Sequence, residues 1–157
     1  MLSSATMTPL TTALETALST GDASTVLAET MRHFSCQAGT VHWLGSDGLL
    51  QLAASQNIPP HIVSIIRTVP IGKGIAGLAA ERREPISLCN LQTDTSGQAR
   101  PAAKTTGMEG SVAVPILVGS ELRGVLGIAK ATAHDWSEEE KAAILAIAAR
   151  LGESQAA

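Results

Sequence analysis

Two predicted β-hairpins constrain the fold of this chain more than any other feature. They span residues 38–55 and 111–129, and their turns are Gly45-Ser46-Asp47-Gly48 and Gly119-Ser120. Short turns of this composition join antiparallel strands, whereas parallel neighbours need a long crossover connection. The sequence therefore predicts a sheet that is largely antiparallel.

Helical patterns occur before, between and after the hairpins. Apolar residues at helical spacing predict two N-terminal helices, the first ending at Gly21 and the second capped by Asp22. Pro59-Pro60 predicts the start of another helix. The capping-box pair Ser137 and Glu140 predicts the start of the last helix. The elements in chain order are helix–helix–hairpin–helix–helix–strand–loop–hairpin–helix, which indicates an α+β fold with a central antiparallel sheet flanked by helices.

Three further details follow from the same patterns. Alternation predicts that Leu122, Leu126 and Ile128 share the inward face of their strand, with Gly124 and Gly127 placed for close approach or a bulge. Residues 84–89 are expected to form an edge strand. Gly152 is expected at the C′ position that ends the last helix.

Residues 69–83, VPIGKGIAGLAAERR, contain Gly72-x-Gly74-x-x-Gly77. This spacing is also found in dinucleotide-binding loops, but those follow a buried strand and lie inside a parallel crossover unit. Here the preceding residues form an amphipathic helical pattern. The first two glycines are instead expected to adopt positive φ at a helix start, and Gly77 to allow close packing.

Composition excludes several classes of function. The chain has 157 residues, one Phe, two Trp and no Tyr, so few rings are present to stack on haem, flavin or nucleobases. Its net charge is −3 and its basic residues are scattered, which argues against nucleic acid or an anionic membrane as a partner. No apolar run has membrane-spanning length, and the N-terminus lacks the pattern of a signal peptide. With only two well-separated cysteines, we predict a cytoplasmic location.

Four passages, taken in order, resemble the GAF domain family. They are PIGKGIAG at 70–77, EPI running into NLQTD between 84 and 94, SVAVPI at 111–116, and LRGVLGI at 122–128 before Trp136-Ser137. The resemblance is closest to GAF sensors of nitrogen-fixation activators and phosphotransferase-system regulators. It implies one GAF-like domain over residues 1–157 with its core at about 10–152, and a PAS-like sheet of about six strands. It also implies a ligand cavity beneath residues 90–110 and packed terminal helices.

The cysteines raise an enzymatic alternative. One GAF branch reduces free methionine sulfoxide by thiolate attack and disulfide resolution, with its cysteines at the glycine-rich helix start and in the mobile loop. Here Ala76 occupies the first region and residues 90–110 contain no cysteine. We therefore interpret Cys36 and Cys89 as structural and predict no enzyme activity. Bilin binding is disfavoured because the loop has no cysteine for attachment. Cyclic-nucleotide binding is disfavoured because the Asn-Lys-x-Phe-Asp-Glu pattern of those GAF domains is absent.

The candidate ligand-binding residues are taken from the strand and the loop that flank the implied cavity. His42 alternates with Val41 and Trp43, so its side chain faces either the cavity or solvent. Residues 90–110 are long and polar enough to form a functional loop, and Arg100 and Lys104 would pair with an anionic ligand. The full candidate set is His42, Trp43, Cys89, Asp94, Arg100 and Lys104. No metal site is expected, since His33 and Cys36 alone lack the ligands of a structural zinc site.

The predicted function is a non-catalytic sensory module for an unidentified small molecule, with any cofactor unknown. Closure of residues 90–110 would be transmitted to the terminal helices. The output would come from an effector protein in trans or from a longer parent chain. A homodimer is predicted through those helices, because the last helix carries a second apolar stripe at Ala142, Leu145, Ala146 and Ala149. A degenerate GAF domain that serves only dimerisation remains an alternative.

Overall fold

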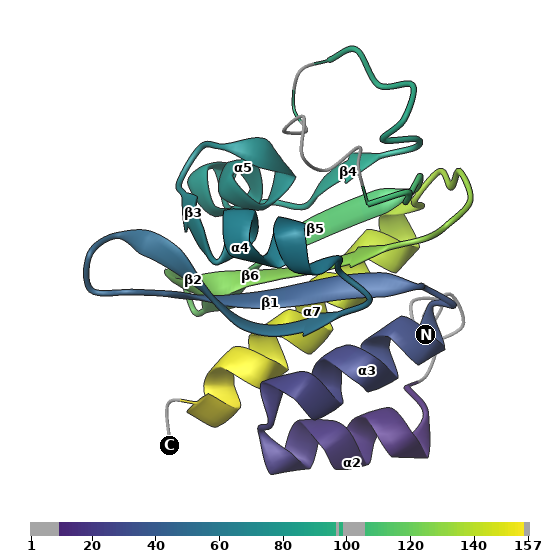
Figure 1. The fold of residues 1–157 in the computed structure, drawn as a ribbon. Coiled ribbons are helices and arrows are strands. Elements are labelled where there is room, and N and C mark those ends of the chain that lie inside the picture. The colour runs from purple at the N-terminus through teal and green to yellow at the C-terminus, as the bar shows by residue number, and fades with distance from the viewer. Residues whose placement is uncertain (1–9, 97, 99–105, 156–157) are drawn as a thin grey trace.

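The computed structural model describes residues 10–96, 98 and 106–155. Six strands form one antiparallel sheet in the order β3-β2-β1-β6-β5-β4 (Figure 1). The helices are α2 (Thr12–Thr20), α3 (Ala23–His33), α4 (Pro60–Ile66), α5 (Gly74–Arg82) and α7 (Glu138–Gln155). The strands are β1 (Ala38–Leu44), β2 (Leu49–Gln56), β3 (Thr68–Pro70), β4 (Ile86–Leu88), β5 (Ser111–Val118) and β6 (Glu121–Ala129). The predicted α+β fold is thus confirmed. The structure also contains the short edge strand β3, which the predicted order of elements lacks.

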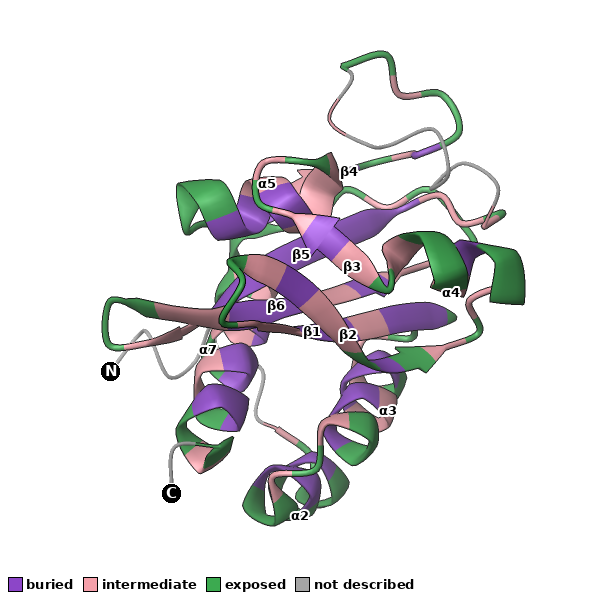
Figure 2. Ribbon diagram, turned by 60° about the vertical axis from the view of Figure 1, so that its left-hand side comes forward, coloured by how far each residue is buried: buried purple, intermediate pink, exposed green. Residues whose placement is uncertain are grey.

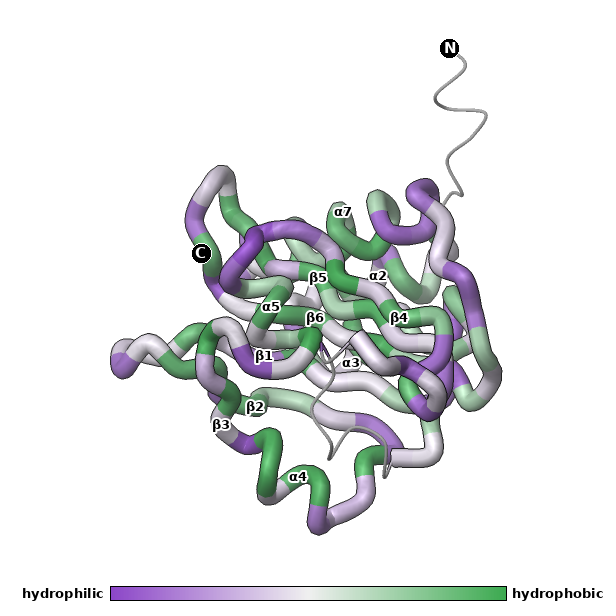
Figure 3. The backbone as a smooth tube through the Cα atoms, turned by 90° about the horizontal axis from the view of Figure 1, so that it is seen from above, coloured by the Kyte–Doolittle hydropathy of each residue, from purple (hydrophilic) through white to green (hydrophobic). Residues whose placement is uncertain are grey.

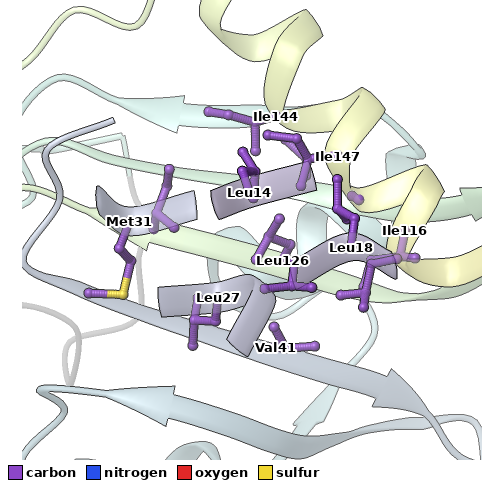
Figure 4. Close-up of a cluster of buried hydrophobic side chains, with 14 of the residues drawn as sticks. Leu14, Leu18, Leu27, Met31, Val41, Ile116, Leu126, Ile144 and Ile147 are labelled. Atoms are coloured by element: carbon purple, nitrogen blue, oxygen red, sulfur yellow. The ribbon is translucent and has the colours of Figure 1, made fainter. Parts of the chain in front are cut away.

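The helices cover both faces of the sheet. Helices α2, α3 and α7 lie on one face and α4 and α5 on the other (Figures 1 and 2). The larger core fills the space between the first group and the sheet (Figure 4). Its buried members are mostly aliphatic side chains, among them Leu14, Leu18, Leu27, Met31, Val41, Ile116, Leu126, Ile144 and Ile147, and they also include Trp136. A smaller core under α5 includes Leu50, Val69, Ala79, Ala113 and Val125.

The predicted helix signals act as expected. Gly21 ends α2 in the left-handed region at φ 70°, and the Asp22 carboxylate accepts a hydrogen bond from the Thr25 amide at 3.0 Å to cap α3. At the start of α7 the Ser137 amide donates to Glu140 Oε1 at 2.9 Å, and the Glu140 amide donates to Ser137 Oγ at 3.1 Å. Both donors would otherwise lack an intrahelical acceptor. The capping box is therefore confirmed.

Removing the Ser137 hydroxyl should destabilise the protein measurably. In Ser137→Ala the Glu140 amide loses its acceptor at the helix start, so we expect the free energy of unfolding to fall by about 1 kcal/mol. Urea unfolding followed by circular dichroism measures this difference. The control is Ser46→Ala in the exposed turn between β1 and β2, which should change stability little. Equal effects of the two substitutions would contradict the capping role.

Two predictions of local geometry were wrong. Leu122 packs against the smaller core, whereas Leu126 and Ile128 belong to the larger one on the opposite face, because the β5–β6 register shifts between Ile116 and Leu117. Gly152 does not end the last helix, since α7 continues to Gln155. A Cβ at Gly152 would lie 2.7 Å from Ile116 Cγ2, so this glycine allows α7 to cross closely over β5.

Helix α7 is also joined to the N-terminal helix. Arg150 Nη1 and Nη2 donate to Glu15 Oε2 and Oε1 at 3.0 and 2.8 Å, in a bidentate pair. The Gln155 side chain donates to the Gly21 carbonyl oxygen at the end of α2. The two terminal helices therefore pack within one chain.

Candidate functional site

A cavity of about 150 Å³ lies on the side of the sheet that carries α4 and α5. Its walls come from strands β1, β5 and β6, from α4, from the start of α5 and from the two described ends of the segment 90–110. The lining residues are mostly aliphatic or small. They are Ala38, Gly39, Thr40, His42, Ile58, Ile62, Ile65, Ile66, Val69, Lys73, Gly74, Ile75, Ala76, Leu91, Thr106, Met108, Ser111, Ala113, Gly127, Ile128 and Ala129.

Small residues on one face of the central strands leave room for this cavity. Ser111 and Ala113 of β5 and Gly127 and Ala129 of β6 line it. The residues that alternate with them, such as Val112 and Leu126, are large and fill the core under α7. Successive side chains of a strand point to opposite faces of the sheet. The sequences SVAV at 111–114 and LGIA at 126–129 therefore place large side chains on the face under α7 and small ones on the face of the cavity.

Helix α4 and the loop ends close the cavity from outside. Pro60 occupies the first turn of α4, and the helix directs Ile62, Ile65 and Ile66 at the cavity. Figure 3 shows the hydrophobic character of this helix. Ile65 is 42% exposed, which is unusual for so large an apolar side chain. Leu91, Thr106 and Met108 supply the wall contributed by the segment 90–110.

The glycine-rich segment builds the start of α5 at the cavity wall. Gly72 and Gly74 have φ of +91° and +69°, and a Cβ at Gly77 would lie 2.5 Å from the Pro70 carbonyl oxygen. This confirms the predicted roles of the three glycines. The preceding strand β3 is short, lies at the sheet edge and pairs antiparallel with β2. The context is therefore not that of a dinucleotide-binding crossover.

The residues of the first turn of α5 line the cavity, and their backbone amides have no intrahelical acceptor. The first intrahelical bond is from the Gly77 amide to the Lys73 carbonyl oxygen at 3.1 Å, so the amides of Gly74, Ile75 and Ala76 precede it. No side chain of the described residues caps the helix. Lys73 adjoins these amides, and it is the only basic side chain apart from His42 among the described lining residues.

His42 is the most deeply buried polar group of the site, with 2% of its surface exposed. Its Nε2 lies 2.8 Å from the Ile66 carbonyl oxygen, so that nitrogen carries the proton and donates it. Nδ1 is buried, and no group in the described part of the chain hydrogen-bonds to it. Burial lowers the pKa of His42, although the bond to Ile66 opposes this effect. The imidazole is therefore neutral, and Nδ1 is an acceptor.

The neutral state of His42 predicts a pH-dependent stability. In the unfolded chain the imidazole takes up a proton as the pH falls through about 6.5, whereas in the folded protein it does so only at lower pH. Below that pH the unfolded state binds more protons than the folded state. The contribution of His42 to the free energy of unfolding is therefore complete above pH 6.5 and decreases as the pH falls below it. Urea unfolding between pH 7.5 and 5 should show a shallower decrease in His42→Leu than in wild type. His61→Gln, at an exposed position, is the control and should keep the wild-type slope.

Of the four predicted ligand-binding residues that the structure describes, one lines the cavity. His42 lines it, whereas Trp43 lies on the other face and packs against the larger core. Cys89 is exposed after β4, and Asp94 accepts a hydrogen bond from Ser96 Oγ at 2.8 Å; neither is among the lining residues. Arg100 and Lys104 fall outside the described residues.

Sequence reasoning missed most of the cavity wall, including the isoleucines of α4 and Lys73. The amphipathic pattern after Pro59-Pro60 predicts a helix with an apolar face, but it does not indicate that this face meets a ligand site. The signal that marks the cavity is the alternation of small and large residues in β5 and β6.

The cysteines are placed apart from the cavity. Cys36 follows α3, is half-buried and packs against the larger core. Burial raises the pKa of its thiol to about 12, although nearby Lys130 opposes the shift. A thiol in that state is a poor nucleophile. Neither cysteine is among the lining residues.

Two further features are absent from the described residues. No cluster of three or more His, Cys, Asp or Glu side chains able to hold a metal ion occurs there. Within the same ranges, no helix is both long and apolar enough to cross a membrane.

Comparisons with known proteins agree with this architecture. The GAF domain of a phosphoenolpyruvate-protein phosphotransferase from Coxiella burnetii is 25% identical, with coverage of 91% of this chain and 90% of that one and a TM-score of 0.72. A free methionine-R-sulfoxide reductase from Neisseria meningitidis, solved with its substrate, is 15% identical, with 92% and 90% coverage and a TM-score of 0.73. A domain of a putative two-component sensor histidine kinase from Sinorhizobium meliloti is 17% identical, with 93% coverage of both chains and a TM-score of 0.66.

No curated protein matches the sequence. The family itself is established by the sequence model of the GAF domain, which matches residues 17–153. Together with the six-stranded sheet, this match shows that the chain belongs to the GAF domain family.

Proposed function

We propose that this protein is a non-catalytic sensory module that binds a small molecule in the cavity between the sheet and helices α4 and α5. The observation that carries the proposal is the cavity itself, with its aliphatic wall and a few polar groups. Ligand sites are typically concave and mainly apolar, with a small number of polar groups that orient the ligand. A cavity near 150 Å³ is of the size that accommodates a benzene-sized molecule.

Strand β5 supplies a physical route from the cavity to the terminal helices. Ser111 and Ala113 line the cavity, while Val112, Val114 and Ile116 on the same strand pack beneath α7. A ligand that shifts β5 would therefore displace the surface on which α7 rests. This coupling is a hypothesis that depends on α7 having two positions.

The test uses a substitution that places a larger side chain in the cavity from β6. Gly127 lines the cavity, and a Cβ there would meet Thr40 Oγ1 at 3.4 Å, an ordinary contact. A library of small aliphatic acids, alcohols and amines is screened by thermal shift against wild type and Gly127→Val. We expect at least one compound to raise the melting temperature of wild type but not that of the variant. If no compound stabilises wild type, or if the variant responds equally, the proposal is wrong.

A second candidate is an enzyme like the free methionine sulfoxide reductases, which are among the structural neighbours. If it is correct, thioredoxin-coupled reduction of free methionine sulfoxide should occur and should vanish in Cys89→Ser. Cys36→Ser is the matched control for loss of a thiol. Measurable turnover of this kind would overturn the non-catalytic assignment.

A homodimer through the terminal helices remains a proposal. Of the second stripe of α7, Ala142 and Ala146 are exposed, and Leu145 is half-buried against the larger core. Small exposed residues permit a close approach of two helices across a two-fold axis. The cytosolic location and an effector protein that receives the signal are likewise predictions.

A further inference from the structure

We infer that the cavity binds an uncharged molecule with a branched hydrocarbon body and rejects the corresponding carboxylate and ammonium ion. This inference rests on the proposed function and gives the ligand of that site a chemical class. It follows from the atoms that the buried part of the wall offers and from the position of its charged group.

The buried part of the wall includes apolar side chains that belong to neither core. Ala38, Ile62 and Leu91 line the cavity and are almost fully buried, yet none of them is a member of the larger or the smaller core. They come from β1, from α4 and from the segment after β4. Buried apolar side chains ordinarily pack into a contiguous core. These three instead offer their apolar surface to a hydrocarbon body seated in the cavity.

Helix α4 adds apolar surface that is still in contact with water. Ile62 is its buried residue, whereas Ile66 is half-buried and Ile65 is 42% exposed, although all three line the cavity. Removing apolar surface from water is favourable in proportion to the area covered. A hydrocarbon ligand under α4 therefore gains affinity from side chains that the folded chain alone leaves partly exposed.

His42 offers no free polar atom to a ligand, although it lines the cavity. Its Nε2–H donates to the Ile66 carbonyl oxygen at 2.8 Å, and its Nδ1 has almost no accessible surface. Burial lowers the pKa of the imidazole, which is therefore neutral. His42 thus forms part of an uncharged wall and supplies no counter-charge for an anion.

The charged group in the described part of the wall lies where water reaches it. Lys73 is the one charged side chain among the described lining residues, and it is exposed. The lining residues at the start of α5, next to Lys73, are also partly exposed. A carboxylate at Lys73 would stay in water, where an ion pair contributes little. An ion placed among the buried side chains would lose its hydration without a buried counter-charge from the described lining residues.

Four compounds with a branched skeleton test this preference by amide NMR titration. They are 2-methylpentane, 3-methylbutan-1-ol, the 3-methylbutylammonium ion and 3-methylbutanoate. The first three differ only in a terminal methyl, hydroxyl or ammonium group, and the last ends in a carboxylate. We expect each uncharged compound to bind wild type at least about tenfold more tightly than either ion, because only the ions must give up the hydration of a charge.

Three variants relate this preference to the wall. Ile65→Ala removes apolar surface from the cavity and should weaken the binding of 2-methylpentane by about fivefold. Val63→Ala is the matched control, since Val63 lies on the same helix but is not among the lining residues. Lys73→Met should leave the binding of both uncharged compounds unchanged. Ile65 and Lys73 are exposed, so these substitutions should not disturb folding.

The outcomes separate this inference from the proposed function. If 3-methylbutanoate binds more tightly than the alcohol, and Lys73→Met removes that advantage, the wall recognises an anion and the inference is wrong. Equal binding of all four compounds, or an unchanged affinity for 2-methylpentane in Ile65→Ala, would also overturn it. In each case the proposed function stands if Gly127→Val abolishes the binding. If neither these compounds nor any library member binds, both are wrong.

Discussion

Gly124→Ala is expected to cost about 3 kcal/mol or more of stability, which is enough to unfold much of the protein. Gly124 lies on β6 opposite Trp43 of β1, where a Cβ would be 2.1 Å from the His42 carbonyl oxygen. The obstructing atom is backbone and belongs to the central strand pair, so it cannot move without loss of β1–β6 pairing. Denaturant unfolding, or the fraction of soluble protein if the variant does not fold, measures the effect.

Gly127→Ala on the same strand is the matched control. It removes the same residue type three positions away, but the added methyl group points into the cavity and makes ordinary contacts. We expect wild-type stability or a gain of about 0.5 kcal/mol, because alanine has less freedom to lose on folding. Similar losses of stability in the two variants would mean that the close approach of β1 does not explain the glycine at position 124.

Leu14→Ala is expected to lower the free energy of unfolding by about 2–5 kcal/mol. Leu14 is fully buried in the larger core beneath α2, where Figure 4 shows it beside Ile144 and Ile147. Removing its side chain leaves a cavity between α2 and α7 that tightly packed neighbours cannot fill. Urea unfolding measures the loss, and Thr16→Ala on the exposed face of α2 should change stability by less than about 0.5 kcal/mol. A small effect at both positions would show that α2 does not complete the core.

The burial of Leu14 also determines which substitution can test the dimer. A charged residue at position 14 would unfold the chain, so any loss of a dimer would be uninformative. Ala146→Glu is the better substitution, because Ala146 is exposed on α7. Sedimentation should show a dimer for wild type and a monomer for the variant. A wild-type protein that is monomeric at high concentration would end the proposal.

The elements that could be predicted from the sequence are those with a local physical signal. Asp22 and the pair Ser137 and Glu140 mark helix starts because their side chains satisfy nearby amides. The turns at Gly45–Gly48 and Gly119-Ser120 fix the hairpins. The strand β3 was missed because three residues carry too little pattern, and it exists through its pairing with β2.

The site was predicted less well because it depends on contacts between distant segments. Alternation predicts that His42 and Val41 point to opposite faces of the sheet. Only the fold shows that the cavity and the Ile66 carbonyl oxygen lie on the face of His42. Trp43 is on the same strand and was also a candidate, yet the same alternation directs it to the core. Glycine is common at helix ends, which led to the prediction for Gly152. Its presence is explained instead by the close packing of α7 against Ile116.

The central claim is that the cavity under α4 and α5 is the ligand site, and amide NMR tests it most directly. Three glycines, Gly39, Gly74 and Gly127, line the cavity, whereas Gly45, Gly48 and Gly119 lie in turns. During titration with the compound that stabilises wild type most, we predict that the first three amide signals shift and saturate while the turn glycines remain unchanged. Gly127→Val should abolish the shifts of Gly39 and Gly74. Saturable shifts confined to the turn glycines, or an unaltered response in the variant, would contradict the account.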